Sequence, residues 1–118
     1  MGYPLVPGYE AVGRVISVGA QSAARVGQRV YVPGARCFGE VKGLFGASAS
    51  RLVVPGHKVI PVDERLGEQA VLMALAATAY HSVSGGGTGA PFAPPDLIVG
   101  HGVLGRLLAR LNVAAGYT

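Results

Sequence analysis

Residues 4–32 read PLVPGYEAVGRVISVGAQSAARVGQRVYV, and this stretch indicates the fold class of the first half of the chain. Its β-branched residues come in short runs that glycine and proline interrupt, as expected for short strands joined by tight turns. The same pattern continues to residue 62. The predicted strand segments are residues 12–18, 29–32, 52–54 and 59–62. Several short strands at this spacing predict a small β-barrel or sandwich.

The second half of the chain has a helical pattern. Asp63 is a predicted N-cap, and apolar residues recur behind it at helical spacing, which predicts one amphipathic helix over residues 65–83. Residues 85–95 are rich in glycine and proline and are predicted to form a flexible linker. After the linker we expect a short strand at residues 97–99. A closing amphipathic helix follows, with an apolar face made of Val103, Leu104, Leu107, Leu108 and Leu111.

The segment GHGVLG lies between that strand and that helix, as in a dinucleotide-binding turn. In such a turn Gly100 would permit the tight bend, Gly102 would let the backbone approach a pyrophosphate, and Gly105 would let the helix pack on the strand. The backbone N–H groups at the helix start, at Val103 and Leu104, would hold phosphate oxygens. The alternative is an ordinary strand-to-helix turn.

The nucleotide-binding unit is unfinished as written. A second strand and an acidic residue about 20 positions after the first glycine, which would contact the ribose, are expected. The sequence ends at Thr118, before both. We therefore expect the chain to be a fragment of a longer protein, and the choice between NAD and NADP stays open.

Composition excludes several classes of protein. The 118 residues are 50% hydrophobic and 14% charged, which argues against disorder. The net charge of +4 comes from scattered cations without interleaved aromatics, so we expect no nucleic-acid partner. Cys37 is the one cysteine, which excludes an internal disulfide framework. The first residues lack a secretory signal pattern, and the longest apolar run is too short to span a bilayer. We expect a cytoplasmic protein without a transmembrane segment.

The order of several motifs resembles the medium-chain dehydrogenase/reductase superfamily. Residues 4–15, with Pro-Gly-Tyr-Glu, and the Val-Gly pair at residues 18–19 are similar to its catalytic-domain signature. Residues 26–30, VGQRV, match the segment that precedes a strand, and residues 77–80, ATAY, match the segment that leads into the cofactor domain. GHGVLG matches the nucleotide turn of the family.

This resemblance implies a fold of mixed β and α/β class. Residues 1–63 would form part of a GroES-like β-barrel, and residues 64–84 a connecting helix. Residues 96–118, after the linker, would form the first strand and helix of a Rossmann domain.

Three longer stretches narrow the resemblance. Residues 32–53 (VPGARCFGEVKGLFGASASRLV), 74–81 (ALAATAYH) and 96–111 (DLIVGHGVLGRLLARL) resemble a branch of the superfamily that acts in bacteriochlorophyll synthesis. The resemblance implies an NAD(P)-dependent oxidation of the hydroxyethyl group of a bacteriochlorophyllide, a tetrapyrrole, to acetyl. Two alternatives stay open, a zinc-independent quinone or enoyl reductase of the same superfamily and a non-catalytic truncated remnant. A homo-oligomer is also left open.

The sequence departs from the zinc-dependent members of the superfamily. Tyr9 stands where those members have a histidine ligand, and Ala74 stands where they have a cysteine ligand. A phenol and a methyl group do not supply the nitrogen or sulfur ligands that catalytic zinc requires. The structural-zinc lobe of the family needs four cysteines, and its region here offers Cys37 alone. We therefore expect this chain to bind no zinc or other metal.

Without a metal, alcohol oxidation needs another group beside the reacting oxygen. Tyr9 is the candidate catalytic residue, because a phenol can hydrogen-bond that oxygen; the alternative is that Tyr9 fills the vacated space. Glu10 is expected to make a structural hydrogen bond or ion pair. Thr78 matches a family threonine beside the nicotinamide, and its alternative is a plain helix hydroxyl.

Overall fold

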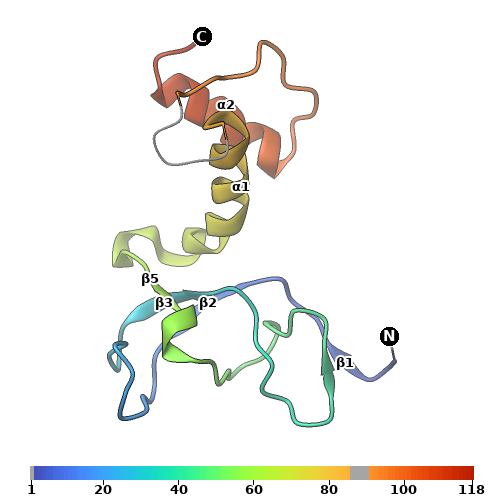
Figure 1. Ribbon diagram of the computed structural model, residues 1–118, viewed down its shortest axis with the longest axis vertical. Coiled ribbons are helices and arrows are strands. Elements are labelled where there is room, and N and C mark those ends of the chain that lie inside the picture. The colour runs from blue at the N-terminus through green and yellow to red at the C-terminus, as the bar shows by residue number, and fades with distance from the viewer. Residues whose placement is uncertain (1, 86–90) are drawn as a thin grey trace. The chain divides into compact units, whose positions relative to one another are not determined.

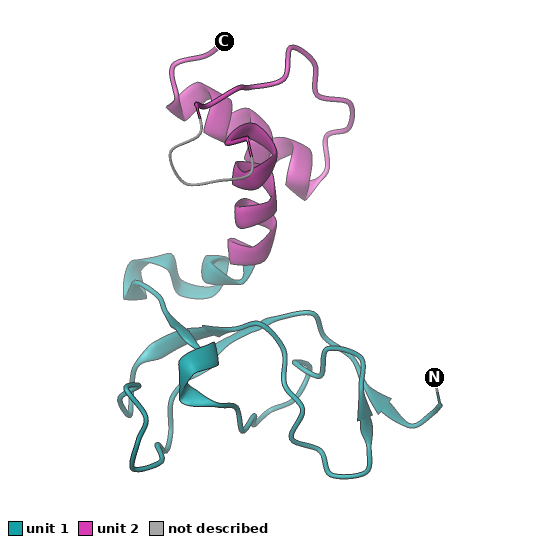
Figure 2. Cartoon of the chain, in the orientation of Figure 1, with its two compact units in different colours: residues 1–71 teal, residues 72–118 magenta. Residues whose placement is uncertain are grey.

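The computed structural model describes residues 2–85 and 91–118, which form two compact units. Figure 1 labels the elements, and Figure 2 separates unit 1, residues 1–71, from unit 2, residues 72–118. Unit 1 contains five short strands. Their bounds are β1 Leu5–Val6, β2 Ala11–Arg14, β3 Arg29–Val32, β4 Lys42–Gly43 and β5 Ile60–Pro61. The remaining elements are the 3-10 helices η1 Gly56–Lys58 and η2 Glu64–Leu72 and the α-helices α1 Met73–Val83 and α2 Val103–Ala114.

Strand β3 is the centre of a three-stranded antiparallel sheet with the order β2-β3-β5. The register places Val12 opposite Tyr31 on one side and Ile60 opposite Tyr31 on the other. Because β3 has a neighbour on each side, Val30, Tyr31 and Val32 are all buried and form the core of unit 1. Strand β5 ends in Pro61, whose missing N–H is tolerated at a sheet edge.

A second sheet of two strands pairs β1 with β4 in parallel, with Leu5 opposite Lys42 and Val6 opposite Gly43. The sequence did not predict it, because Lys-Gly has no β-forming pattern. The segment between β3 and β4 folds back through a hydrogen bond from the N–H of Ala35 to the carbonyl oxygen of Phe45, 2.7 Å long. This fold buries Ala35.

Two predicted strand segments are shorter or absent. The strand predicted over residues 12–18 ends at Arg14, with Val15 still hydrogen-bonded to Gln28 and Gly27, and Ile16 and Val18 are exposed. Residues 52–54 form no strand. Five short strands in two sheets do not close a barrel within the described part of the chain, which agrees with the predicted partial β-barrel. Unclosed sheets leave apolar residues such as Ile16 without a neighbouring strand to cover them.

The helix predicted over residues 65–83 is two elements. Gly67 has φ 54° and ψ −134°, a conformation that interrupts the 3-10 helix η2, and the α-helix starts at Met73. Asp63 is confirmed as a cap, because its Oδ1 accepts the backbone N–H of Arg65 at 2.8 Å. The prediction of one continuous helix was therefore wrong in its first half, where Gly67 adopts a non-helical conformation that hydrophobic periodicity does not reveal.

In unit 2, α1 packs against α2. Ala79 and Val83 of α1 are fully buried, and Leu107, Leu108 and Leu111 of α2 are half-buried. Of the predicted linker, residues 86–90 lie outside the described residues, and residues 91–95 have no regular structure. Every helix in the described ranges is too short or too polar to cross a bilayer.

Residues 97–99, which were predicted to form a strand, form none in the structure, and the assignment of residues 96–118 to a Rossmann domain stays a prediction. The side chains of Leu97 and Val99 are 76% and 90% exposed. A strand is stabilised by hydrogen bonds to a neighbouring strand, and unit 2 as described contains none. The helix after it forms as predicted, beginning at Val103.

Candidate functional site

The Pro-Gly-Tyr-Glu turn is held against residues 47–48 by backbone hydrogen bonds. The carbonyl oxygen of Gly8 accepts the N–H of Ala47 at 3.0 Å, and that of Pro7 accepts the N–H of Ser48 at 2.9 Å. Gly8 has φ 109°, and a Cβ at this position would collide with the backbone nitrogen of Ser48. This turn therefore requires glycine both for its conformation and for the close approach of two backbones.

Tyr9 projects from this turn toward solvent. Its side chain is 59% exposed, and its ring meets Phe45 edge to face, with ring centroids 4.9 Å apart. The phenol oxygen of Tyr9 forms no hydrogen bond within the described residues. Phe45 has φ 67°, a left-handed conformation that is unusual for a bulky residue. The hydrogen bond from Ala35 holds it there, so the aromatic neighbour of Tyr9 is fixed by the fold.

Glu10, the next residue, accepts at its Oε2 a hydrogen bond of 2.9 Å from the hydroxyl of Tyr31, a buried residue of β3. The expected structural hydrogen bond of Glu10 is therefore confirmed. Burial raises the pKa of Tyr31 above its ordinary value, and the hydrogen bond to Glu10 raises that pKa further. Tyr31 thus stays a neutral donor at physiological pH and fixes the residue that follows Tyr9.

A surface ion cluster connects β2 and β3 to the start of η2. Both terminal nitrogens of Arg14 donate to the Glu64 carboxylate at 2.8 Å, and Nε of Arg29 donates to it at 3.2 Å. The hydrogen bond from Arg14 is the main reason why the pKa of Glu64 is lowered, and the same bond raises the pKa of Arg14. This cluster stabilises the sheet and is not part of the candidate site.

The donor set does not fit a zinc ion. Tyr9 and Ala74, at the positions of two family ligands, offer a phenol and a methyl group. The described residues contain no group of three histidine, cysteine or acidic side chains that could hold a metal. Cys37 is half-buried, and its sulfur accepts the N–H of Val53 at 3.4 Å.

In the glycine turn of unit 2, Gly100 and Gly105 stand where a side chain is disfavoured, and the role of this turn in binding a nucleotide stays a prediction. Gly100 has φ 108°, and a Cβ at Gly105 would collide with the carbonyl oxygen of Gly100. Gly102 has open space where a Cβ would stand, and it precedes the first residue of α2. The first hydrogen bond of the helix runs from the N–H of Arg106 to Gly102, at 3.0 Å. The N–H groups of Val103 and Leu104 therefore have no acceptor within the helix and are free to bind an anion.

Thr78 lies on an exposed part of α1, and its Oγ1 donates to the carbonyl oxygen of Ala74 at 2.9 Å. This bond uses the hydroxyl proton and leaves the oxygen able to accept. Within unit 2, no hydrogen bond joins Thr78 to the glycine turn among the described residues. Tyr9 belongs to unit 1, whereas Thr78 and the glycine turn belong to unit 2.

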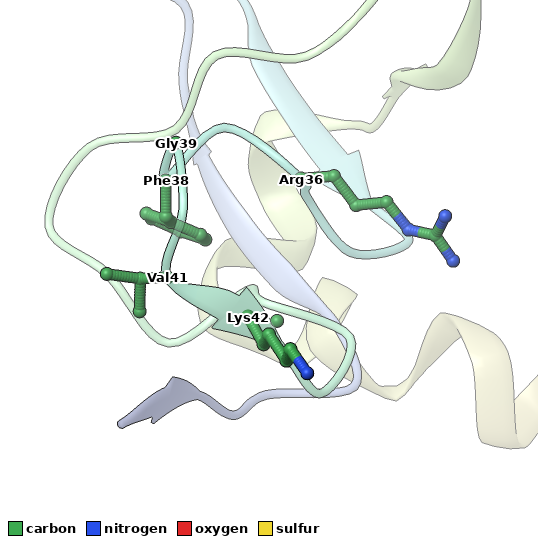
Figure 3. A pocket seen from close by; sticks show the side chains of 6 residues that line it. Arg36, Phe38, Gly39, Val41 and Lys42 are labelled. Carbon is green, nitrogen blue, oxygen red and sulfur yellow. The ribbon is translucent and has the colours of Figure 1, made fainter. Parts of the chain in front are cut away.

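Sequence reasoning missed a hollow in the segment around β4. Figure 3 shows it, lined by Arg36, Phe38, Gly39, Val41, Lys42 and Gly43, with a volume of about 350 Å³. Its two cations stand six residues apart in a segment without regular periodicity, so the sequence carried no signal that they share one site.

Comparisons of the sequence with known proteins identify a family and two relatives. The family of the alcohol dehydrogenase GroES-like domain matches residues 1–64. A protein of Cereibacter sphaeroides named 2-desacetyl-2-hydroxyethyl bacteriochlorophyllide A dehydrogenase is 52% identical over 98% of this chain and 37% of its own length. A Rhodobacter capsulatus protein of the same name is 51% identical over 98% of this chain and 36% of its own length. No solved structure matches.

The chain thus spans a little over a third of the length of these two relatives. The similarity covers both units, including the Pro-Gly-Tyr-Glu turn of unit 1 and the glycine turn of unit 2. The matched domain, the open sheets of unit 1 and the identity to both relatives agree, and the chain belongs to the alcohol dehydrogenase family with a GroES-like domain.

Proposed function

We propose that this chain is part of a zinc-independent, NAD(P)-dependent oxidoreductase of bacteriochlorophyll synthesis. Its reaction is the oxidation of the hydroxyethyl group of a bacteriochlorophyllide to acetyl. The observation that supports this most strongly is the identity of about one half to two proteins named for that dehydrogenation, spread over nearly the whole chain. The carbinol carbon would give its hydride to a nicotinamide cofactor, and the hydroxyl would give its proton to solvent, which leaves the acetyl carbonyl.

Tyr9 is the residue that we propose to hydrogen-bond the reacting oxygen of the substrate. Its phenol is exposed and without a hydrogen-bond partner in the described chain, and its ring is braced by Phe45. The O–H of a phenol can donate a hydrogen bond to the oxygen of a substrate. Its role is therefore to hydrogen-bond the reacting oxygen and to orient the carbinol, while the Tyr31–Glu10 hydrogen bond steadies the next residue of the turn.

The glycine turn is the proposed cofactor-binding segment. When bound, a nicotinamide cofactor accepts the hydride. The free N–H groups of Val103 and Leu104 would hold its phosphates, with Gly102 leaving room for their approach. The oxygen of Thr78 would accept a hydrogen bond from the nicotinamide end. We propose NAD, with NADP as the alternative.

Zinc independence is proposed from the chemistry of the residues at the ligand positions. Tyr9 and Ala74 supply neither nitrogen nor sulfur, and zinc prefers three such protein ligands in a catalytic site. No step of the proposed reaction involves a metal.

A chimera tests the proposal, with this chain in place of the matched segment of the Cereibacter sphaeroides relative. We expect it to oxidise the hydroxyethyl bacteriochlorophyllide with NAD, to form the acetyl product, and to ignore quinones and enoyl substrates. The unmodified relative is the activity control, and thermal unfolding shows whether the chimera is folded. A folded chimera that reduces quinones and leaves the hydroxyethyl group untouched supports the reductase alternative instead.

A second variant tests Tyr9 within that chimera. Tyr9→Phe keeps the ring beside Phe45 and removes the phenol oxygen. We expect kcat to fall by roughly 100- to 1000-fold, the range that one positioned hydrogen-bond donor contributes to catalysis. Unchanged turnover contradicts a role for Tyr9 and leaves the overall reaction standing.

A further inference from the structure

The hollow around β4 is lined by two cationic side chains. Arg36 and Lys42 are both exposed and both line it, and in Figure 3 their side chains extend away from Phe38 and Val41. Neither cation forms an ion pair with a carboxylate among the described residues. Two unpaired cations at the edge of one hollow favour an anionic group that both can contact.

The opposite wall of the hollow is apolar and fixed by backbone packing. Phe38 is half-buried, and a Cβ at Gly46 would lie 3.0 Å from its ring, so ring and backbone are in close contact. Gly46 also packs against the carbonyl oxygen of Ala35. Val41 is 40% exposed beside the ring. A ligand in this hollow would therefore contact an apolar surface and a cationic edge together.

A second hollow of about 340 Å³ shares Val41 and Lys42 with the first. It is lined in addition by Gly2, Tyr3, Pro4 and Glu40. Tyr3 is 91% exposed and extends the apolar surface. Glu40 lines this second hollow and not the first, so the acidic residue of the segment is separate from the Arg36 edge.

We propose that Arg36 and Lys42 bind a carboxylate carried by a large, flat, apolar substrate whose ring rests on Phe38 and Val41. An unesterified chlorophyllide has this chemistry, because its apolar macrocycle bears a free propionate. The inference rests on the proposed function for the identity of the substrate. The site selects the free acid over its esters.

Phosphate is the other anion that two cations could hold. An apolar wall does not help to bind a free phosphate, and the cofactor phosphates have their own proposed site at the glycine turn of unit 2. The carboxylate of an amphiphilic substrate uses both walls of the hollow. Competition with inorganic phosphate distinguishes a phosphate site from a carboxylate site.

The test is a fluorescence titration of the 118-residue chain with pheophorbide a, a tetrapyrrole with one free propionate, and with its methyl ester. We expect the acid to bind roughly three- to tenfold more tightly than the ester, the effect of two charge-assisted contacts at an exposed site. The double variant with Arg36→Gln and Lys42→Gln should lose this preference and keep its affinity for the ester. Lys58→Gln, a cation in η1 that lines neither hollow, is the matched control and should keep the preference.

Three results would overturn the inference. The first is equal affinity of the wild-type chain for acid and ester, and the second is a preference for the acid that survives in the double variant. The third is displacement of the acid by NAD or inorganic phosphate at concentrations that leave the ester bound. Circular dichroism of each variant shows that its fold is kept, and the acid-to-ester comparison in the wild-type chain needs no variant. Turnover by the chimera is measured separately. An inactive chimera whose chain still prefers the acid contradicts the proposed function and leaves this site standing.

Discussion

Replacing Tyr31 by phenylalanine deletes one oxygen atom from the core of unit 1 and leaves the ring in place. The hydroxyl is buried and donates to Glu10 at 2.9 Å, so its loss leaves a half-buried carboxylate oxygen without that donor. Hydrogen bonds to charged groups contribute about 1.5–3 kcal/mol, and water reaches a half-buried carboxylate in part. We therefore expect the free energy of unfolding to fall by about 1–2 kcal/mol.

Urea denaturation of the chain measures this loss. With a slope of about 1–3 kcal/mol per molar urea for a small protein, the midpoint should fall by roughly 0.3–2 M. Tyr9→Phe is the matched control, because it removes the same atom from an exposed ring without a partner in the described chain. The control should shift stability by less than about 0.5 kcal/mol. Equal effects of the two substitutions would contradict a stabilising role for the Tyr31 hydroxyl.

The raised pKa of Tyr31 adds a dependence on pH with a definite sign. A raised pKa in the folded state means that the folded chain holds the Tyr31 proton more tightly than the unfolded chain. This contribution to stability is complete below about pH 10, the ordinary tyrosine pKa, and is lost as the pH rises from there toward the raised pKa. Tyr31→Phe should remove that part of the alkaline destabilisation. An unchanged alkaline profile in the variant contradicts the assignment.

Three further predictions follow from local geometry. Arg14 lowers the pKa of Glu64, so the contribution of Glu64 to stability is present above the ordinary carboxyl pKa and is lost as the pH falls through the lowered pKa. Glu64→Gln should therefore make the melting temperature less sensitive to acid. The same fall of the melting temperature at low pH in the variant would contradict this. Gly8→Ala should destabilise the chain by about 2–4 kcal/mol through its positive φ and the collision with Ser48, whereas Gly13→Ala, which meets open space, should not destabilise it in the same urea assay. Gly105→Ala should weaken NAD binding by the chimera at least tenfold, because its Cβ would displace the Gly100 carbonyl; isothermal titration that finds equal affinity would contradict this.

The parts of the fold that the sequence predicted are those with a complete local pattern. β3 lies where Arg-Val-Tyr-Val stands between a glycine turn and a proline, and Asp63 caps the segment that it precedes. The prediction of a strand at residues 97–99 failed because a strand also needs a neighbouring strand to pair with, and the described residues of unit 2 contain none. The helix break at Gly67 and the parallel pair of β1 with β4 depend on tertiary contacts without a periodic signal.

The candidate site divides in the same way. The shape of the glycine turn follows from local chemistry, because glycine spacing sets both the bend and the helix contact. The bond between Tyr31 and Glu10 joins residues 21 positions apart, and the hollow at Arg36 and Lys42 depends on how the segment after β3 folds back. Long-range contacts of this kind become visible only in the three-dimensional structure.

The central claim is that residues of this chain support dehydrogenation of a hydroxyethyl tetrapyrrole without zinc. The most direct measurement is NADH formation by the chimera with the hydroxyethyl bacteriochlorophyllide, before and after exhaustive chelation, with the zinc content determined on the same samples. We expect far less than one zinc ion per chimera molecule, and the same rate of NADH formation before and after chelation. Activity that disappears on chelation and returns with added zinc would contradict it.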